Sequence, residues 1–553
     1  MGVPRYLCSM FVRKKANKSG SVSVQVVAKT RIRRQKVIKS IGSSKDPKEI
    51  ECLMAEGRNY INRHHEPQLP GIDEEEIGFE HFLGQLNNSQ IQVVGPELVF
   101  GRLYERIGYD KISSEMFRHM VICRLFNPGS KLKTVDYLER YLHVRYSLSK
   151  VYRFLDKLCY RPEEDEEEVE VVEKKGENVP GANEGRKSDA RRKKGQDYKT
   201  IVEQISYEHT KKVVGGEVTV CFYDMTTLYF ETAEEDELRK CGFSKDGKHS
   251  CPQIFLGLLV ALGGNPIGYE IYEGNISEGK TIIPVVQALA DRFGFGKPVV
   301  VADAGLLSKD NIETLVKDGY QYILGARPKN ESEKVKESIL ALNLKYGDVA
   351  EVKRKDGSRL IVSCSEKRAA KDRHNREKGL ARLQKRVRTG KLTKESINNR
   401  GYNKYLKLEG EVNVFIDLAK YEADAAWDGI KGYVSNTKLK AGEVIDRYGD
   451  LWYIERAFRF NKFDLAVRPI YHRLHNRIER HICICFTAYT ILLELERILK
   501  AAKSEITVHR AQELTKTMYA ISYVSPKSSL SQRVILGMSD EQQALCNLVK
   551  GGA

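Results

Sequence analysis

The feature that most constrains the fold of this sequence is a pair of apolar strands that each lead to an aspartate. Residues 218–227 follow two glycines and predict a buried strand. Its apolar, β-branched run stops at Asp224, and the stretch then continues into two threonines. Residues 297–303 repeat the pattern with a β-branched run that ends at Asp303. A carboxylate at a strand end is held on a stiff element, where a metal ligand would be placed, but an aspartate after a strand is also a common turn residue. Whether these aspartates are metal ligands or turn residues depends on whether the chain supplies further carboxylates to bind the same metal.

From residue 217 onward the pattern alternates between strands and helices. The predicted elements are strands at 254–262 and 267–272 joined by a Gly-Gly-Asn-Pro turn, a helix at 279–294, and strands at 297–303 and 320–324. Three strands, a helix and a strand, with carboxylates at strand ends, is the order of a ribonuclease H-like mixed α/β sheet with flanking helices. Parallel neighbours in such a sheet would bring Asp224 and Asp303 side by side.

A third carboxylate, Glu455, lies in a predicted helix from residue 441 to residue 462. Helical spacing puts it on one face with Tyr448, Leu451, Phe458, Arg459 and Lys462. The apolar residues favour burial of this face against the sheet, where a carboxylate needs a cation to pair with. The alternative is an ordinary surface glutamate beside a cation. Two aspartates and a glutamate that converge suit two divalent cations, and hard oxygen ligands select Mg²⁺ or Mn²⁺.

The charge of the chain indicates its partner. Lys and Arg total 92 against 75 Asp and Glu, a net charge of +17, which favours nucleic acid first and an anionic membrane surface second. The same excess argues against glycoside hydrolysis, the other chemistry that a carboxylate pair suits. No apolar run is long enough to span a bilayer and no signal peptide begins the chain, so we expect an intracellular protein without a membrane partner. Eleven cysteines without a repeated Cys-x-x-Cys pair indicate reduced core residues.

At 553 residues the chain is expected to hold about two to four domains. Its basic, β-prone start suits either a DNA-binding module or a sheet edge protected by charge. The predicted division is a small basic β module (1–45), a helical domain (46–160), a charged flexible insertion (161–197), the first part of the ribonuclease H-like core (198–329), a β-rich and basic helical insertion (330–440), the second part of the core with the glutamate helix (441–500), and a C-terminal helical segment (501–553).

Several segments together carry a resemblance to a known family. They are residues 222–231 (Phe-Tyr-Asp-Met-Thr-Thr-Leu-Tyr-Phe-Glu), 246–248 with Gln253, 274–276, 301–305 (Val-Ala-Asp-Ala-Gly), and 448–455 (Tyr-Gly-Asp-Leu-Trp-Tyr-Ile-Glu) with Phe458 and Lys462. Over most of residues 100–500 the chain resembles the DDE transposases of bacterial insertion sequences, in the group whose ribonuclease H-like core is interrupted by a β-rich insertion. The resemblance implies that Asp224, Asp303 and Glu455 are the catalytic and metal-binding triad.

The glutamate region of that family has a Tyr, Arg, Glu and Lys at fixed spacing. Tyr448, Glu455 and Lys462 fit the spacing, whereas the arginine position holds Leu451. The resemblance implies that Lys462 contacts a phosphate near the tip of the element. A basic cluster follows the glutamate and suits a phosphate backbone. The residues expected to bind DNA are Tyr448, Arg459, Lys462, Arg468, His472 and Arg473.

The resemblance implies an enzyme, a transposase for DNA transposition and recombination. It would bind the terminal inverted repeats of its own element, cleave double-stranded DNA as a metal-dependent endonuclease with two Mg²⁺ or Mn²⁺ ions, and join the freed 3′-ends to target DNA. A homodimer in the synaptic complex and a cytoplasmic, nucleoid-associated place in a bacterium are also implied. Two other interpretations stay open: a catalytically inactive or repurposed DNA-binding protein, and a metal-dependent nuclease without strand transfer.

Overall fold

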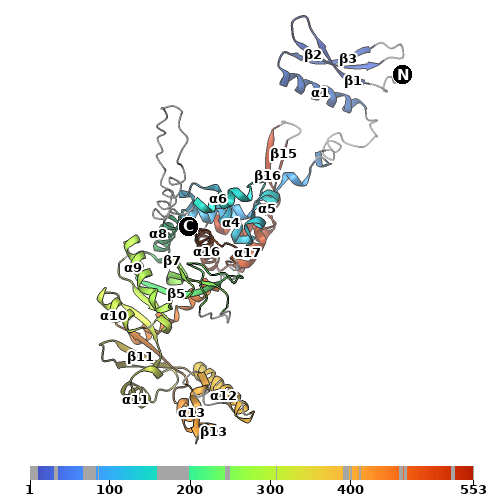
Figure 1. Cartoon of the computed structure of the whole chain (residues 1–553). Helices are drawn as coiled ribbons and strands as arrows, with labels where there is room; N and C mark the ends of the chain where they lie inside the picture. Colours follow the sequence, from blue (N-terminus) through green and yellow to red (C-terminus); the bar gives the residue numbers. More distant parts are fainter. Residues whose placement is uncertain are drawn as a thin grey trace, which may run out of the picture. The chain divides into compact units, whose positions relative to one another are not determined.

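The computed structural model divides into two compact units, Met1–Gln90 with Tyr523–Ser531, and Ile91–Ser522 with Gln532–Ala553 (Figure 1). The residues that it describes are 10–29, 35–65, 82–84, 86–157, 198–242, 250–294, 296–306, 308–389, 398, 401–409, 413–459, 465, 467, 470–524 and 530–551. The charged insertion predicted at 161–197 and the segment 246–248 lie outside these residues.

The first unit is built on a three-stranded antiparallel sheet in the order β1-β2-β3. Its strands are β1 (Met10–Ala16), β2 (Val22–Lys29) and β3 (Gln35–Ser44), and helix α1 (Pro47–His65) follows them. Gly42 and Gly57 let the helix approach the sheet, because a Cβ at either position would crowd Leu53 or Val12. The helix therefore belongs to the same small unit as the basic strands.

The core of the second unit is a mixed sheet. It contains β5 (Val220–Tyr229), β6 (Gln253–Ala261), β7 (Pro266–Glu273), β8 (Val299–Ala302) and β9 (Tyr322–Ala326). β5, β6 and β7 form an antiparallel meander, and β8 pairs parallel with both β5 and β9. The resulting order, β7-β6-β5-β8-β9, is that of a ribonuclease H-like sheet, so the predicted fold class is confirmed.

Three strands from the predicted insertion extend this sheet past β9. They are β10 (Val349–Lys353), β11 (Arg359–Cys364) and β14 (Ile430–Ser435), paired antiparallel in the order β10-β11-β14-β9. Between β11 and β14 the chain makes an excursion with its own small core around Leu383, Tyr405 and Leu406. The excursion holds α12 (Glu366–Arg388), β12 (Leu406–Glu409), β13 (Asn413–Ile416) and α13 (Leu418–Ala425).

Both faces of the sheet are buried, which explains why its strands are apolar without alternation. Along β5, Phe222 and Leu228 lie in one core while Cys221 and Tyr223 lie in the other. The Tyr223 face is covered by α9 (Ile282–Phe293), α10 (Lys309–Lys317) and α11 (Glu333–Ala341). The opposite face is covered by helices from before and after the sheet in the sequence, including the long central helix α16 (His475–Ala501) (Figure 1).

The remaining elements lie wholly or mostly in the second unit, and three of them form a separate sheet in the order β16-β15-β4. They are β4 (Ile91–Val93), a π-helical turn (Glu97–Gly101), α3 (Arg102–Ile107), α4 (Glu115–Phe126), α5 (Lys131–Leu142), α6 (Leu148–Lys157), α8 (Tyr198–Val214), α14 (Ala441–Gly449), α15 (Trp452–Arg459), α17 (Val508–Thr515), β15 (Tyr519–Val524), β16 (Ser531–Ile535) and α18 (Asp540–Gly551). Within the part of the chain that the structure describes, no helix has the length and apolar character needed to cross a membrane.

The single helix predicted from 441 to 462 is wrong. α14 ends at Gly449, Asp450 caps it, and α15 starts afresh at Trp452. Glycine and aspartate are both weak helix formers, and together they allow the chain to break here. Glu455 therefore lies on a short second helix, α15.

A buried carboxylate ties α8 to the sheet. Glu203 is fully buried, and its Oε1 accepts a hydrogen bond of 3.0 Å from the backbone N–H of Tyr269 in β7. It forms ion pairs with Lys199, at 3.4 Å, and with Arg292 of α9. Burial raises the pKa of Glu203, and the two cations oppose that effect.

We expect Glu203→Ala to lower the free energy of unfolding by about 3 kcal/mol, because it leaves two partly buried cations with one carboxylate, Glu270, between them. Chemical denaturation measures the loss. The control is Glu208→Ala on the same helix, whose 3.6 Å ion pair with Lys111 is solvent-exposed and whose removal should change stability by less than about 0.5 kcal/mol. Equal losses in the two variants would contradict the role given to Glu203.

Candidate active site

The first two predicted carboxylates come from adjacent parallel strands. Tyr223 of β5 lies level with Ala302 of β8, so the next residues, Asp224 and Asp303, are neighbours at the same edge. Asp224 is half-buried and Asp303 is exposed. The prediction that the first strand stops at Asp224 is wrong, because β5 continues to Tyr229. The long partner strand β6 continues to supply hydrogen bonds after β8 has ended.

A tyrosine from α14 joins the site through Asp303. The Tyr448 hydroxyl donates a hydrogen bond of 2.7 Å to Asp303 Oδ1. Burial raises the pKa of Tyr448, and the hydrogen bond to Asp303 and the negative charges of Asp303 and Asp224 raise it further. The hydroxyl thus stays protonated and acts as a fixed donor. It lies against the backbone of Gly325 in β9, where a Cβ would overlap it.

Glu455 lies on α15 beside this group, but not as predicted. Leu451, Ile454 and Phe458 are buried against the sheet, whereas Glu455 is exposed. The expectation that the apolar residues would bury the glutamate with them is wrong. Leu451, Ile454, Ala457 and Phe458 pack into the core, and the glutamate stays outside it.

Sequence reasoning missed one residue of the site, Lys431 of β14. Its Nζ lies 4.3 Å from the centre of the Tyr448 ring and 5.2 Å from that of Tyr433. Burial lowers the pKa of Lys431 and the charge of Arg368 lowers it further, while the carboxylates of Asp303 and Glu455 oppose both effects. No local pattern marks a lone lysine in a short strand, so only the pairing of β14 with β9 reveals it.

The predicted DNA-binding residues divide between exposed, buried and undescribed positions. Arg459, at the end of α15, and Arg473 are exposed. Tyr448 is buried against Asp303, and His472 is buried with its ring edge toward Tyr152 at 6.2 Å. Burial, with the charges of nearby cations, lowers the pKa of His472 to about 3, so it carries no charge at neutral pH. Lys462 and Arg468 lie outside the described residues.

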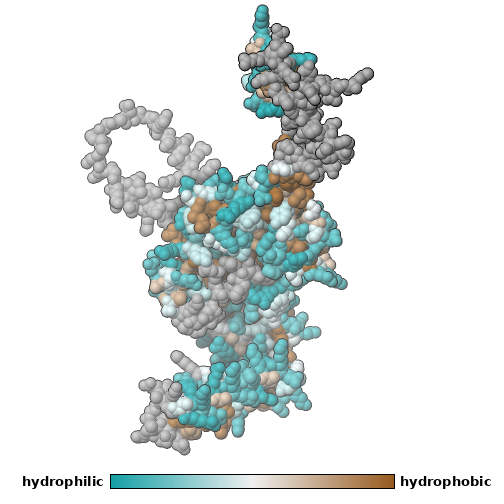
Figure 2. Space-filling view, turned by 90° about the vertical axis from the view of Figure 1, so that its right-hand side faces the viewer, coloured by the Kyte–Doolittle hydropathy of each residue, from teal (hydrophilic) through white to brown (hydrophobic). Residues whose placement is uncertain are grey.

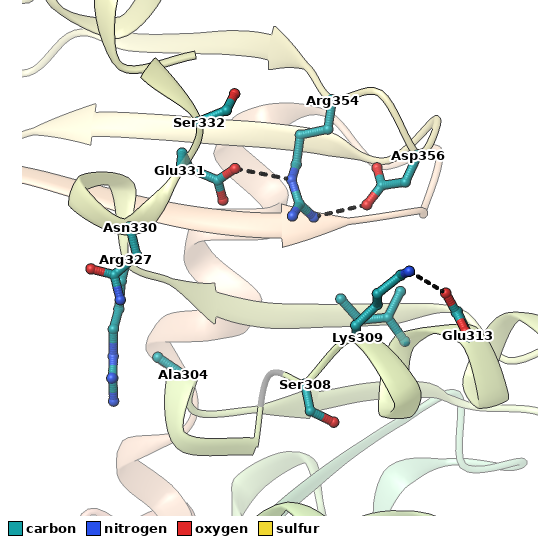
Figure 3. Close-up of a pocket in the computed structure, with 11 residues that line it drawn as sticks. Ala304, Ser308, Lys309, Glu313, Arg327, Asn330, Glu331, Ser332, Arg354 and Asp356 are labelled. Carbon is teal, nitrogen blue, oxygen red and sulfur yellow. Dashed lines mark ion pairs between the residues drawn. The ribbon is translucent and has the colours of Figure 1, made fainter. Parts of the chain in front are cut away.

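Two cavities share a lining residue, Arg327, which directly follows β9. One, of about 360 Å³, is lined by Ala304, which directly follows Asp303, and by residues of α10 and the start of the insertion. In it Arg354 lies between Glu331 and Asp356, at 3.4 and 3.1 Å, while Arg327 points away from that pair (Figure 3). The second, of about 450 Å³, shares Arg327 with the first and reaches Lys431.

The arrangement supplies three carboxylates, a fixed hydroxyl donor and a cation from five different elements. Carboxylate oxygens are hard ligands suited to Mg²⁺ or Mn²⁺. Among the described residues, no three His, Cys, Asp or Glu side chains lie close enough together to hold a metal ion. Tyr448 and Lys431 lie among the carboxylates and provide the hydrogen bond and positive charge that neighbouring acids need.

Comparisons with known proteins place these residues in one domain. Residues 217–491 match the family model described as "Transposase DDE domain", a segment that includes all three carboxylates. A solved structure described as "Cryo-EM structure of piggyBac transposase synaptic complex with hairpin DNA" aligns over 76% of this chain and 76% of that chain, with 9% sequence identity and a TM-score of 0.34. No curated protein matches the sequence.

We expect Gly325→Ala to destabilise the protein by about 1 to 3 kcal/mol, because the new Cβ would overlap the Tyr448 hydroxyl and lie 2.9 Å from the Ala304 nitrogen. Thermal or chemical unfolding measures this loss. Gly442→Ala, in α14 with no atom within 4 Å of the added Cβ, is the control and should be neutral or slightly stabilising. If Gly325→Ala were as stable as this control, the close packing of Tyr448 on β9 would be refuted.

Proposed function

Through its domain at residues 217–491 the chain belongs to the DDE transposase family, and we propose that it moves its own insertion sequence. In this proposal it binds the terminal inverted repeats, cuts the DNA at the element's ends and joins the freed 3′-ends to target DNA. The nucleophile is water in the cutting step and the 3′-hydroxyl in the joining step. Both are phosphoryl transfers on the same backbone, so one site serves for both.

The observation that supports this proposal is that Asp224 and Asp303 are neighbours on adjacent strands while Glu455 acts on the same lysine as Asp303, Lys431. Phe222 and Val301, two residues before Asp224 and Asp303, lie in the core that α14 and α15 also enter, so these elements share one face of the sheet. Asp303 and Glu455 are exposed to solvent, and Asp224 is half-buried.

The three carboxylates are the residues that would hold divalent ions. When bound, such ions supply a Lewis acid that activates the attacking oxygen and neutralises charge on the phosphate. Holding them requires the carboxylates to come closer together than in this structure. Glu455 is exposed on the eight-residue helix α15.

Two tyrosines fix the orientation of the Asp303 carboxylate. The Tyr448 hydroxyl holds Oδ1 of Asp303 and so leaves the other oxygen of that carboxylate for a ligand. The buried aromatic pair of Tyr448 and Tyr433, with ring centres 4.9 Å apart, fixes the direction of that hydrogen bond. Positioning of this kind lowers the reorganisation needed when the phosphate arrives.

The inserted segment supplies a surface for DNA. α12 carries ten Lys and Arg residues and three Asp and Glu residues. The lower part of Figure 2, where the insertion lies, is mostly hydrophilic. We propose that α12 and the basic strands of the first unit contact the phosphate backbone. A homodimer that pairs two element ends, in a bacterial cytoplasm close to the nucleoid, completes the proposal.

Cleavage of DNA tests the assignment of the triad. In Mg²⁺, with a duplex that carries the inverted repeat flanking the coding sequence, we expect Asp224→Asn, Asp303→Asn and Glu455→Gln each to lower the cleavage rate by at least about a thousandfold. Gel analysis of end-labelled DNA measures cutting, and a second, supercoiled DNA in the same reaction measures joining.

The control for cleavage is Asp291→Asn, an exposed aspartate at the end of α9, which should cleave like the wild type. Equal cleavage by wild type and Asp224→Asn would refute the proposed site. Cleavage without joined products would indicate a nuclease, and binding without any cleavage would indicate a DNA-binding protein.

Binding of DNA should depend steeply on salt, because Lys and Arg exceed Asp and Glu by 17 and the exposed helix α12 is strongly basic. We expect the affinity for the same duplex to fall at least about a hundredfold between about 50 and 200 mM KCl. Fluorescence anisotropy in EDTA measures it. A flat response would show that phosphate contacts do not dominate binding.

A further inference from the structure

Two cations lie just past the end of the pairing between β14 and β9. Gly432 and Ala326 are the last antiparallel pair of that ladder, and Lys431 and Arg327 are the next residues beyond it. Arg327 follows β9 directly, with φ −109° and ψ 89°, and precedes the 3-10 turn that begins at Pro328. Both side chains line the cavity of about 450 Å³, and like charges that share one space repel each other unless an anion lies between them.

The register also shows which face of the sheet Lys431 lies on. Tyr433, two residues after Lys431, lies opposite Gly325, and both Tyr433 and Lys431 contact the ring of Tyr448. Residues two apart on a strand share a face. Lys431 therefore lies on the face that carries the Tyr448–Asp303 hydrogen bond.

The other cations of the same cavity already have carboxylate partners. Lys329 and Lys404 bind Asp424 at 2.6 and 2.8 Å, and Arg376 binds Asp428 at 2.5 Å. Among the described residues, neither Lys431 nor Arg327 forms an ion pair with a carboxylate.

A third cation, Arg368 in the first turn of α12, acts on the charge of Lys431 and reaches Asp372 at 3.5 Å. The charge of Lys431 is thus opposed by Arg368 and favoured by the carboxylates of Asp303 and Glu455. Lys431, Arg327 and Arg368 therefore concentrate positive charge next to the carboxylates. An anion placed between these cations would relieve their mutual repulsion.

We propose that Lys431 and Arg327 are positioning residues that hold one phosphate of the DNA strand beside the phosphate that reacts. This inference rests on the proposed function and adds the inserted strand β14 to the site. A phosphate diester carries one negative charge and two free oxygens, enough to accept a hydrogen bond from each cation. The cavity of about 450 Å³ that both side chains line is the space for it.

A phosphate fits this place better than a permanent ion pair with the acids of the site. Lys431 approaches aromatic rings rather than a carboxylate oxygen, so its ammonium keeps its donors for a ligand. Arg327 lines both cavities, and a strand that passes it would run from Ala304, next to Asp303, toward β14. The phosphate held there would set how far along the strand the reacting bond lies.

The test compares Lys431→Met with Lys431→Arg in the full chain. In EDTA, with the inverted-repeat duplex, we expect Lys431→Met to raise Kd about tenfold and to reduce the slope of log Kd against log salt by about one. Lys431→Arg should restore binding to within about threefold of the wild type. The matched control is Lys353→Met, which removes an exposed lysine from the far edge strand β10 and should leave both quantities unchanged.

Neutral methylphosphonate linkages then locate the phosphate. The linkages are placed one at a time around the cleaved bond. At one position the linkage should weaken binding by the wild type about tenfold and leave the affinity of Lys431→Met unchanged. The inference fails if Lys431→Met binds like the wild type, or if each linkage weakens both proteins equally. The proposed function has a separate test, because wild-type protein that does not cleave in Mg²⁺ refutes it whatever Lys431 does.

Discussion

The hydrogen bond from Tyr448 to Asp303 is the interaction on which the site depends. It joins α14, late in the sequence, to the end of β8, and so ties the two halves of an interrupted core. Its geometry requires bare backbone at Gly325, since a side chain there would occupy the place of the hydroxyl. Because burial and the nearby carboxylates raise the pKa of Tyr448, the hydroxyl keeps its proton and the bond persists across the physiological range.

The insertion contributes residues to the site. Its last strand, β14, returns to pair with β9 and brings Tyr433 and Lys431 to the face that holds the carboxylates. The basic helix α12 and its small core form the excursion between β11 and β14. A sheet extended in this way gives the insertion a rigid base, so a cation on β14 can be placed as accurately as a residue of the core.

Much of the fold follows from local patterns. The start of the strand that carries Asp224, the strand before Asp303, the Gly-Gly-Asn-Pro hairpin and the helix before Gly294 each lie within about three residues of the predicted place, because each depends on neighbours in sequence. Errors arise where distant segments compete. β5 pairs with β6 past Asp224, and Glu455 is exposed although Leu451 and Phe458 are buried.

Periodicity and residue type are sufficient to indicate a ribonuclease H-like sheet, two strand-end aspartates and a strongly basic chain. They do not reveal that Tyr448 donates to Asp303, that His472 is buried and uncharged, or that Lys431 and Arg327 line one cavity. Those properties come from strand register and from burial between segments far apart in the chain. The physical reason is that side-chain spacing repeats within one element, whereas charge, protonation and reach depend on which other elements pack against it.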